Sequence, residues 1–319
     1  MENPDPSRNS RSLLEKVFLS PDERRLRAGW RLLLHLVILW ILTLTLTAGL
    51  GFFFVSGGAS ISQDVFLFMG QFVSTLAITL SVYIARGYLD QRSFTSLGLP
   101  WTRTALLDLV AGVSIALVMM TVIFLVLLLG GWVEITGFGW QDQETAAWFN
   151  SVLTFFFIFV LGAWLEELLV RGYWLQNLED GLNLFWGVLL SSAVFSVLHL
   201  LNPGASLLSS IGIFLAGLFF AFSYLVTRRL WLPMGLHFGW NFFLGPVLGM
   251  AVSGIDTPSM LVTNLAGPEI ITGGVFGPEA GLVLLPGLVV GALLVYAYSR
   301  RQPADLDKPS GQQNEEQQA

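Results

Sequence analysis

The sequence predicts an all-α fold, a polytopic membrane bundle of about eight transmembrane helices. Two observations lead to this prediction. Of the 319 residues, 54% are hydrophobic and only 12% are charged, whereas about 25% of the residues are charged in an ordinary soluble domain. The apolar residues also gather in long runs, and a helix needs roughly 20 such residues to cross a bilayer core of about 30 Å. The mean hydropathy of +0.68 agrees with this class.

Eight apolar stretches account for the predicted membrane helices. They cover residues 30–54, 65–85, 105–130, 148–167 or beyond, 184–201, 207–227, 232–251 and 281–298. The first stretch follows 29 polar, charge-rich residues and has no small-residue cleavage site after it. We therefore interpret it as an uncleaved span rather than as a signal peptide.

The distribution of charge predicts the orientation in the membrane. With eight spans and a cytoplasmic N-terminus, all 16 Lys and Arg residues lie in or beside cytoplasmic segments. The external loops then carry only acidic residues, which are Asp64, Glu134, Asp142, Glu144, Asp256, Glu269 and Glu279. Because cytoplasmic loops of membrane proteins are rich in Lys and Arg, both termini are predicted to be cytoplasmic. The expected partner is the lipid bilayer, with no nucleic acid.

One membrane domain is expected over residues 30–299, between a polar cytoplasmic arm (1–29) and a cytoplasmic tail (300–319). The tail is rich in Gln, Glu, Pro and Asp, a composition typical of disordered segments. The sequence contains no nucleotide-binding glycine loop and no large soluble catalytic region. Any chemistry is therefore expected among the helices, in a core at about 148–248.

Few ionisable residues lie inside the spans, and each is expected to face protein or water because a charge in hydrocarbon costs several kcal/mol. The chain has no Cys, which excludes disulfides, thiolate metal sites and cysteine nucleophiles. The polar side chains and one aromatic neighbour that we single out in the fourth, fifth and seventh spans are Glu166, Glu167, Arg171, Phe195, His199, His237 and Asn241.

Helix geometry separates the two glutamates, because adjacent residues project about 100° apart while residues four apart share a face. Glu167 can pair with Arg171, which leaves Glu166 free to point toward another helix. His237 and Asn241 likewise share one face. A structural role is the alternative for each of these residues, as an intrahelical ion pair or an interhelical hydrogen bond.

Two further ionisable residues have a structural interpretation. His35 lies close to the basic arm, where an interfacial histidine is common. Asp108 lies near the start of the third span, as a helix-start or interfacial acid. We expect neither residue to take part in chemistry.

In combination, the singled-out groups suit the hydrolysis of an amide. One carboxylate, two imidazoles and one amide on three helices supply a base for water and donors for a developing oxyanion. The same groups could supply three ligands to a zinc ion with an open position for water. The residues by themselves leave both arrangements open.

The three motifs resemble those of one family. Glu166-Glu167-x-x-x-Arg171, Phe195-x-x-x-His199 and His237-x-x-x-Asn241 are similar to the motifs of the CPBP family. These are the CAAX-protease and bacteriocin-processing intramembrane endopeptidases, also called Abi proteins. All seven family positions are matched in order, over about a third of the chain.

The resemblance implies a catalytic cavity that opens to the cytoplasm, with Glu166 as general base and His199 as its partner. It implies that His237 and Asn241 form the oxyanion site, supported by Glu167, Arg171 and Phe195. The family has been described both as metalloproteases and as metal-independent glutamic proteases. The expected cofactor is therefore none or a divalent metal such as zinc, and the absence of a His-Glu-x-x-His motif favours the metal-independent alternative.

The site requires one irregularity in the bundle. At 1.5 Å per residue, His199 lies about 24 Å from the cytoplasmic start of its span, whereas Glu166 and His237 lie in the cytoplasmic part of theirs. The fifth helix is therefore expected to start below the membrane surface or to tilt strongly, with residues 171–185 dipping inward.

The expected function is that of a CAAX-protease-like endopeptidase that cleaves a membrane-associated peptide or protein. A non-proteolytic membrane scaffold or regulator with the same fold is the alternative, and a transporter is a weaker third hypothesis. The protein is expected to be integral to a prokaryotic plasma membrane. The sequence leaves the oligomeric state and the identity of the substrate open.

Overall fold

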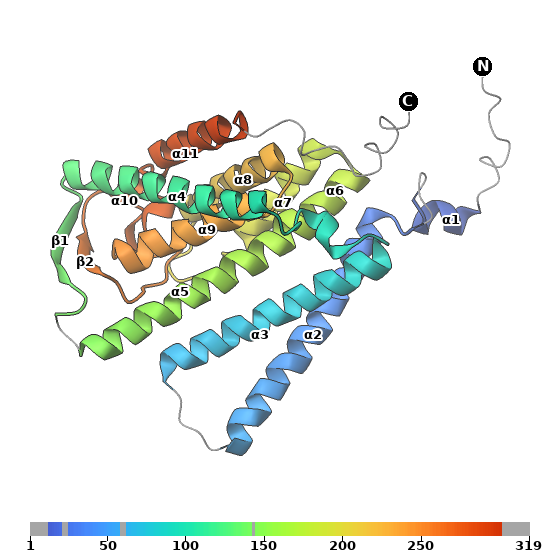
Figure 1. The fold of residues 1–319 in the computed structure, drawn as a ribbon, viewed down its shortest axis with the longest axis horizontal. Coiled ribbons are helices and arrows are strands. Elements are labelled where there is room, and N and C mark those ends of the chain that lie inside the picture. The colour runs from blue at the N-terminus through green and yellow to red at the C-terminus, as the bar shows by residue number, and fades with distance from the viewer. Residues whose placement is uncertain (1–11, 21–24, 58–61, 142–143, 302–319) are drawn as a thin grey trace.

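The predicted all-α fold is confirmed. A computed structural model of the chain describes residues 12–20, 25–57, 62–141 and 144–301. Helices dominate these residues, with a small two-stranded sheet at one end of the bundle (Figure 1). The beginning of the predicted polar arm (1–11) and nearly all of the predicted disordered tail (302–319) lie outside the described residues.

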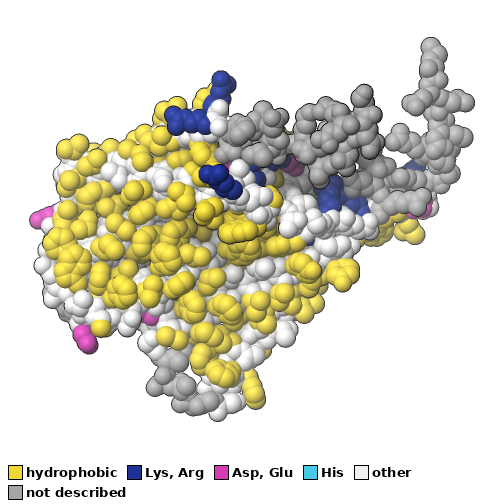
Figure 2. Space-filling view, in the orientation of Figure 1, with side chains coloured by type: hydrophobic (Ala, Val, Ile, Leu, Met, Phe, Trp, Pro, Cys, Tyr) yellow, Lys and Arg dark blue, Asp and Glu magenta, His cyan; other side chains and the backbone are white. Residues whose placement is uncertain are grey.

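Each predicted span contains a helix. In chain order these are α2 (Ala28–Gly57), α3 (Gln63–Ile84), α4 (Arg103–Leu129), α5 (Thr145–Glu167), α7 (Leu184–Leu198), α8 (Leu207–Thr227), α9 (Trp231–Phe242) and α11 (Leu284–Ser299). Within the described residues, five helical segments are long and apolar enough to cross a membrane, whereas α7 and α11 are shorter apolar helices. This composition is that of an integral membrane protein, and hydrophobic side chains cover much of the face in Figure 2.

The helix that contains the two adjacent glutamates continues past Glu167, as the open end of its predicted span allowed. After α5 the chain continues through a π-helical segment, η4 (Leu168–Leu175), into α6 (Gln176–Gly181). The next helix, α7, begins almost at once, because the side chain of Asn183 accepts a hydrogen bond from the backbone N–H of Trp186 and so caps its first turn. The short turn makes α6 and α7 antiparallel neighbours.

This hairpin brings Glu166 and His199 to one level. Glu166 precedes Gly181 by 15 residues, and His199 follows Leu184 by 15 residues, so each lies ~22 Å from the turn. Residues 171–185 form helix as far as Gly181, and their expected inward dip stays a prediction. The alignment arises because the helix continues for 14 residues past Glu167, to Gly181.

Glycines bring the backbones of α4 and α9 into contact. A Cβ atom on Gly112 would lie 2.5 Å from the carbonyl oxygen of Leu232 and 2.6 Å from the backbone nitrogen of Leu236. A Cβ atom on Gly235 would lie 2.4 Å from the carbonyl oxygen of Leu109. Small residues allow this close approach between membrane helices. The contact fixes the position of α9, which carries His237.

Ion pairs tie the helix ends together near α6. Asp90 accepts hydrogen bonds from Arg31 at 2.9 Å and from Arg86 at 2.8 Å, and it is buried. Asp180 contacts Arg25 at 2.5 Å and Arg31 at 2.9 Å. The Lys and Arg side chains visible in Figure 2 lie toward the upper edge of the molecule. A cavity of about 680 Å³ borders this cluster and includes none of the motif residues.

The structure places His35 and Asp108 in the interior rather than at an interface. His35 is buried between Ser81, whose Oγ lies 3.2 Å from Nε2, and Trp174, whose Nε1 donates to Nδ1 at 3.4 Å. Asp108 is buried and pairs with Arg229 at 2.6 Å. Both residues join helices, because a polar side chain inside the bundle needs a partner.

The segments at the opposite end of the bundle are ordered. Strand β1 (Val133–Phe138) pairs antiparallel with β2 (Leu261–Leu265). The long Gly- and Pro-containing stretch then continues through α10 (Glu269–Thr272) and two 3-10 turns, η6 (Gly274–Phe276) and η7 (Pro278–Ala280), before α11. Part of this stretch folds back onto the bundle and buries Glu279.

The α4–α9 contact predicts a strong effect of one methyl group. We expect Gly112→Ala to lower the free energy of unfolding by about 1–3 kcal/mol, because the new Cβ overlaps backbone atoms of α9 that cannot move independently. Denaturation of the purified protein in mixed micelles measures this loss. Gly70→Ala on α3 is the matched control, since no atom of a described neighbouring residue lies within 4 Å of its added Cβ. Equal stability of the two variants would contradict the role of the contact.

Candidate active site

The motif residues of α5, α7 and α9 converge on one cavity. It has a volume of about 430 Å³, and its lining includes Glu166, His199, His237 and Asn241. Glu166 Oε2 lies 3.9 Å from His199 Nε2 and 3.8 Å from His237 Nε2. The four side chains that were predicted to act together therefore share one space, in which both imidazoles point a ring nitrogen at the same carboxylate oxygen.

His199 is oriented by the end of its own helix. It is the C-cap residue of α7, and its Nδ1 lies 2.8 Å from the carbonyl oxygen of Phe195. Since a carbonyl only accepts, Nδ1–H is the donor in this hydrogen bond. The last carbonyls of a helix have no partner within the helix, and the imidazole supplies one. Nε2 is thereby directed toward Glu166.

Glu167 lies at the centre of a buried charged cluster. Its Oε1 atom accepts a hydrogen bond from Arg171 at 2.9 Å and lies 2.8 Å from Nδ1 of His237. Glu167 and Arg171 are fully buried. Arg171 also donates to the carbonyl of Gly217 on α8 at 3.1 Å. The predicted intrahelical pair is thus present. Glu167 also contacts α9 through His237, and Arg171 contacts α8 through Gly217.

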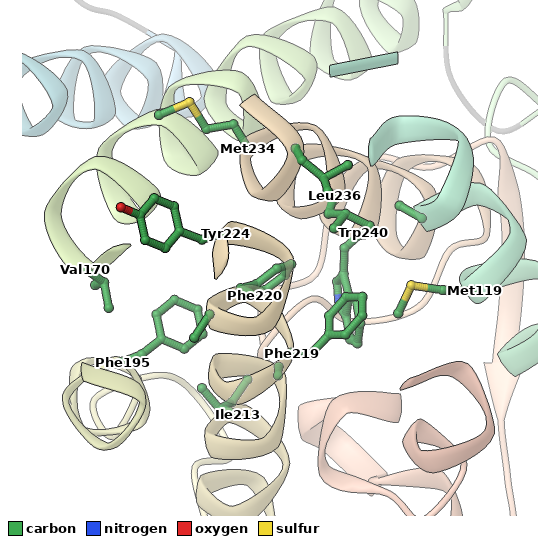
Figure 3. Packing of buried hydrophobic residues seen from close by; sticks show 14 of the residues in the cluster. Met119, Val170, Phe195, Ile213, Phe219, Phe220, Tyr224, Met234, Leu236 and Trp240 are labelled. Carbon is green, nitrogen blue, oxygen red and sulfur yellow. The ribbon is translucent and has the colours of Figure 1, made fainter. Parts of the chain in front are cut away.

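Aromatic rings cover the arginine and the second imidazole. The Arg171 guanidinium carbon lies 4.3 Å from the ring centre of Phe195 and 5.3 Å from that of Phe220, at distances typical of cation–π contacts. The ring of Phe220 stacks on His237, with centres 4.8 Å apart. Figure 3 shows Phe195 and Phe220 facing one another across the contact between α7 and α8. Phe195 therefore contributes packing around the charged cluster.

Asn241 lies one helical turn after His237 on α9 and is half-buried. Both residues line the cavity, in agreement with the predicted shared face. On the opposite helices, Ile158, Phe159 and Ile78 give the same cavity apolar walls. The polar groups are therefore concentrated around Glu166 and the two histidines.

The sequence prediction missed Glu279, which also lines this cavity. It was placed in an external loop, but it is only 4% exposed. It accepts hydrogen bonds from Trp240 Nε1 at 2.9 Å, from the Ser253 hydroxyl at 2.9 Å and from the Ser253 backbone N–H. Burial raises the pKa of this carboxyl, whereas the Ser253 donors and the nearby His199 oppose the shift. A glutamate between Gly and Pro residues has no helical periodicity to indicate burial.

Glu279 connects the segments that carry the candidate groups. Trp240 is adjacent to Asn241, and the carbonyl of Ser253 accepts a hydrogen bond from Asn202 at 3.0 Å. Asn202 follows His199 in the turn after α7. The loop between β2 and α11 thus links α9 to the end of α7 on one side of the cavity.

A family match covers the same region. Residues 148–243 match the family model Rce1-like, described as type II CAAX prenyl endopeptidase Rce1-like. The match confirms the family resemblance that the motifs predicted, over the segment that contains all seven motif residues. No match was found among curated proteins, and none among solved structures.

The buried cluster predicts strong coupling between Glu167 and Arg171. We expect Arg171→Met to lower the free energy of unfolding by about 3–5 kcal/mol, because the variant removes the Arg171 partner of the buried Glu167 carboxylate. The double variant Glu167→Gln with Arg171→Met should recover part of the loss. Denaturation curves of the four proteins provide the coupling energy. Additive effects would contradict the cluster.

Proposed function

We propose that this chain, whose residues 148–243 carry the Rce1-like CAAX endopeptidase region, is an intramembrane endopeptidase acting on a membrane-associated peptide or protein. One observation carries the proposal. Glu166 Oε2 has no hydrogen-bond partner among the described residues, although two histidine nitrogens face it at 3.8 and 3.9 Å. A carboxylate oxygen that lacks a protein partner and faces two imidazole nitrogens is a suitable acceptor for a bound water molecule.

The separation of these atoms suits activation of that water. One water molecule can lie about 2.8 Å from both Glu166 Oε2 and His199 Nε2, since these atoms are 3.9 Å apart. Because Nδ1 of His199 carries the proton that it donates to Phe195, Nε2 of the neutral ring is an acceptor. The water then donates one hydrogen to each group, and its oxygen lone pair is free to attack a carbonyl carbon.

In the proposed reaction, Glu166 takes a proton from the water as the C–O bond forms. The carbonyl oxygen becomes an oxyanion, stabilised by His237 and Asn241. With both ring nitrogens protonated, His237 donates Nδ1–H to Glu167 and Nε2–H to the oxyanion. Glu166 then passes its proton to the leaving amine as the C–N bond breaks. Glu167, Arg171 and Phe195 hold His237 and its surroundings in place.

The proposed mechanism routes no step through a metal or another cofactor. Within the part of the chain that the structure describes, no three His, Asp or Glu side chains are grouped as metal ligands. The Nδ1 atoms of both histidines are engaged by protein, and their Nε2 atoms face Glu166. In the proposed water activation by Glu166, both histidines keep these orientations.

The surroundings of the site support a substrate that is associated with the membrane. The cavity extends between apolar side chains of α2, α3 and α5, among them Leu39, Ile78 and Phe159. We propose that the bilayer presents the substrate to this cavity, with both termini of the enzyme in the cytoplasm of a prokaryotic cell. The positive charge near α6 supports this orientation.

The central prediction concerns Glu166. Glu166→Gln should abolish cleavage while leaving folding intact, because the amide cannot accept a proton from water and Oε2 of Glu166 makes no hydrogen bond to a described residue. Cleavage of a prenylated peptide ending in a CAAX sequence, together with mapping of protein termini in whole membranes, measures the effect. Folding is checked by denaturation. Unchanged termini and an unchanged cellular phenotype in this variant would favour a scaffold.

Chelation distinguishes the proposed water mechanism from zinc catalysis. We expect cleavage by the purified protein to persist after prolonged treatment with a strong chelator and to show no recovery on addition of zinc. Elemental analysis of the same preparation should detect no stoichiometric metal. Loss of cleavage that zinc restores, with one bound ion per chain, would replace the water mechanism by a metal-dependent one.

A further inference from the structure

One polar side chain in the cavity wall has no role in the proposed reaction. Gln71 lies in the apolar helix α3, is half-buried and lines the candidate active-site cavity. Its backbone carbonyl accepts a hydrogen bond from the hydroxyl of Thr75 at 2.8 Å. Its side-chain amide makes no hydrogen bond to any residue that the structure describes. It therefore differs from the buried polar groups of the bundle, such as His35 and Asp108.

Helix association does not explain this amide. A glutamine inside a membrane helix normally hydrogen-bonds to a neighbouring helix, and α3 packs against α5. The residue of α5 beside the amide is Gly162, whose added Cβ would lie 3.6 Å from Gln71 Nε2. A glycine presents no side-chain partner. The amide is therefore available to a molecule in the cavity.

The position of Gly162 relates the amide to the candidate base. Gly162 and Glu166 are four residues apart on α5, so they share a face and lie about 6 Å apart along the helix axis. An extended chain advances ~3.3 Å per residue. A substrate that lies extended along this wall, with its scissile bond at Glu166, would place another peptide unit beside Gln71 about two residues away.

The chemistry of the side chain matches such a unit. A glutamine amide offers one acceptor oxygen and an NH₂ donor, which complement the N–H and C=O groups of a peptide bond. Nearby wall residues Ile78, Ile158 and Phe159 are apolar, and they could not satisfy those groups. An extended backbone between apolar walls has no water and no helix to satisfy its N–H and C=O groups, so a hydrogen-bond partner at this position stabilises the extended form.

We propose that Gln71 is a substrate-binding residue that hydrogen-bonds a backbone peptide unit about two residues from the scissile bond. The proposal rests on the endopeptidase function proposed above. It assigns Gln71 to holding the substrate chain straight across Glu166, without any part in proton transfer. Because the hydrogen bond is made equally before and during bond cleavage, its loss should raise KM and leave kcat nearly unchanged.

The first experiment compares cells that produce the wild-type protein or one variant as their only copy. Gln71→Met keeps the length of the side chain and is apolar, which favours retention in the membrane. Ser74→Ala is the matched control, because Ser74 lies on the same helix, is exposed and, among the described residues, donates only to the carbonyl of Gly70. Glu166→Gln defines which new protein termini depend on the site. Pulse labelling with terminal peptide mapping provides the rate at which each appears.

We expect Gln71→Met to slow the Glu166-dependent cleavages roughly tenfold, the effect of losing one to two net hydrogen bonds. Ser74→Ala should leave them unchanged. Wild-type rates in Gln71→Met would overturn the substrate-binding role alone. If no termini depend on Glu166, the endopeptidase function itself fails, and the role of Gln71 fails with it.

A second experiment uses a synthetic peptide that spans the fastest of these cleavage sites. Replacing single peptide N–H groups by ester oxygens removes one backbone donor at a time. In wild-type protein, the ester about two residues from the scissile bond should raise KM several-fold more than esters further away. In Gln71→Met the same ester should cause no further loss. Equal sensitivity of both proteins at every position would overturn the proposal.

Discussion

The candidate active site depends on the buried carboxylate of Glu167. One of its oxygens contacts both Arg171 and the Nδ1 atom of His237, so a single acceptor joins the long α5–α6 helix to α9. Arg171 extends this connection to α8 through the carbonyl of Gly217. Burial makes each of these contacts strong and makes the loss of any one partner costly. These contacts therefore fix the position of His237 in the wall of the cavity.

This arrangement places two adjacent glutamates in different surroundings. Because neighbouring helix residues project about 100° apart, Glu167 faces the protein interior while Glu166 faces the cavity. Both partners of Glu167 contact its Oε1 atom, and Oε2 of each glutamate has no hydrogen-bond partner among the described residues. The two residues differ in their surroundings, because Glu167 is fully buried whereas Glu166 lines the cavity. The buried cluster contacts His237 through Glu167, and in the proposed mechanism the cavity-facing Oε2 atom of Glu166 binds the water. The proposal thus assigns a structural role and a chemical role to two adjacent residues.

The remainder of the fold supports the spacing of these groups. Glycines let α9 approach α4 at backbone distance, and the Asn183 cap begins α7 directly after α6. Glu279 links α9 to the loop that follows His199 through Trp240 and Ser253. Each contact fixes the relative position of two helices. Together they hold three helices around a cavity that is lined by these polar groups, by Gln71 of α3 and by many apolar side chains.

The sequence by itself determined the membrane class, the approximate spans and the motif residues, since these follow from apolar runs and from helix periodicity. It also paired Glu167 with Arg171, because that contact lies within four residues. Only the tertiary structure decided the common level of Glu166 and His199, the burial of Glu279, and the exposure of Gln71 to the cavity. The common level depends on the continuation of α5 into α6, and the exposure of Gln71 depends on the absence of a side chain at Gly162 on the neighbouring helix. Such relations join distant residues, and local periodicity carries no information about them.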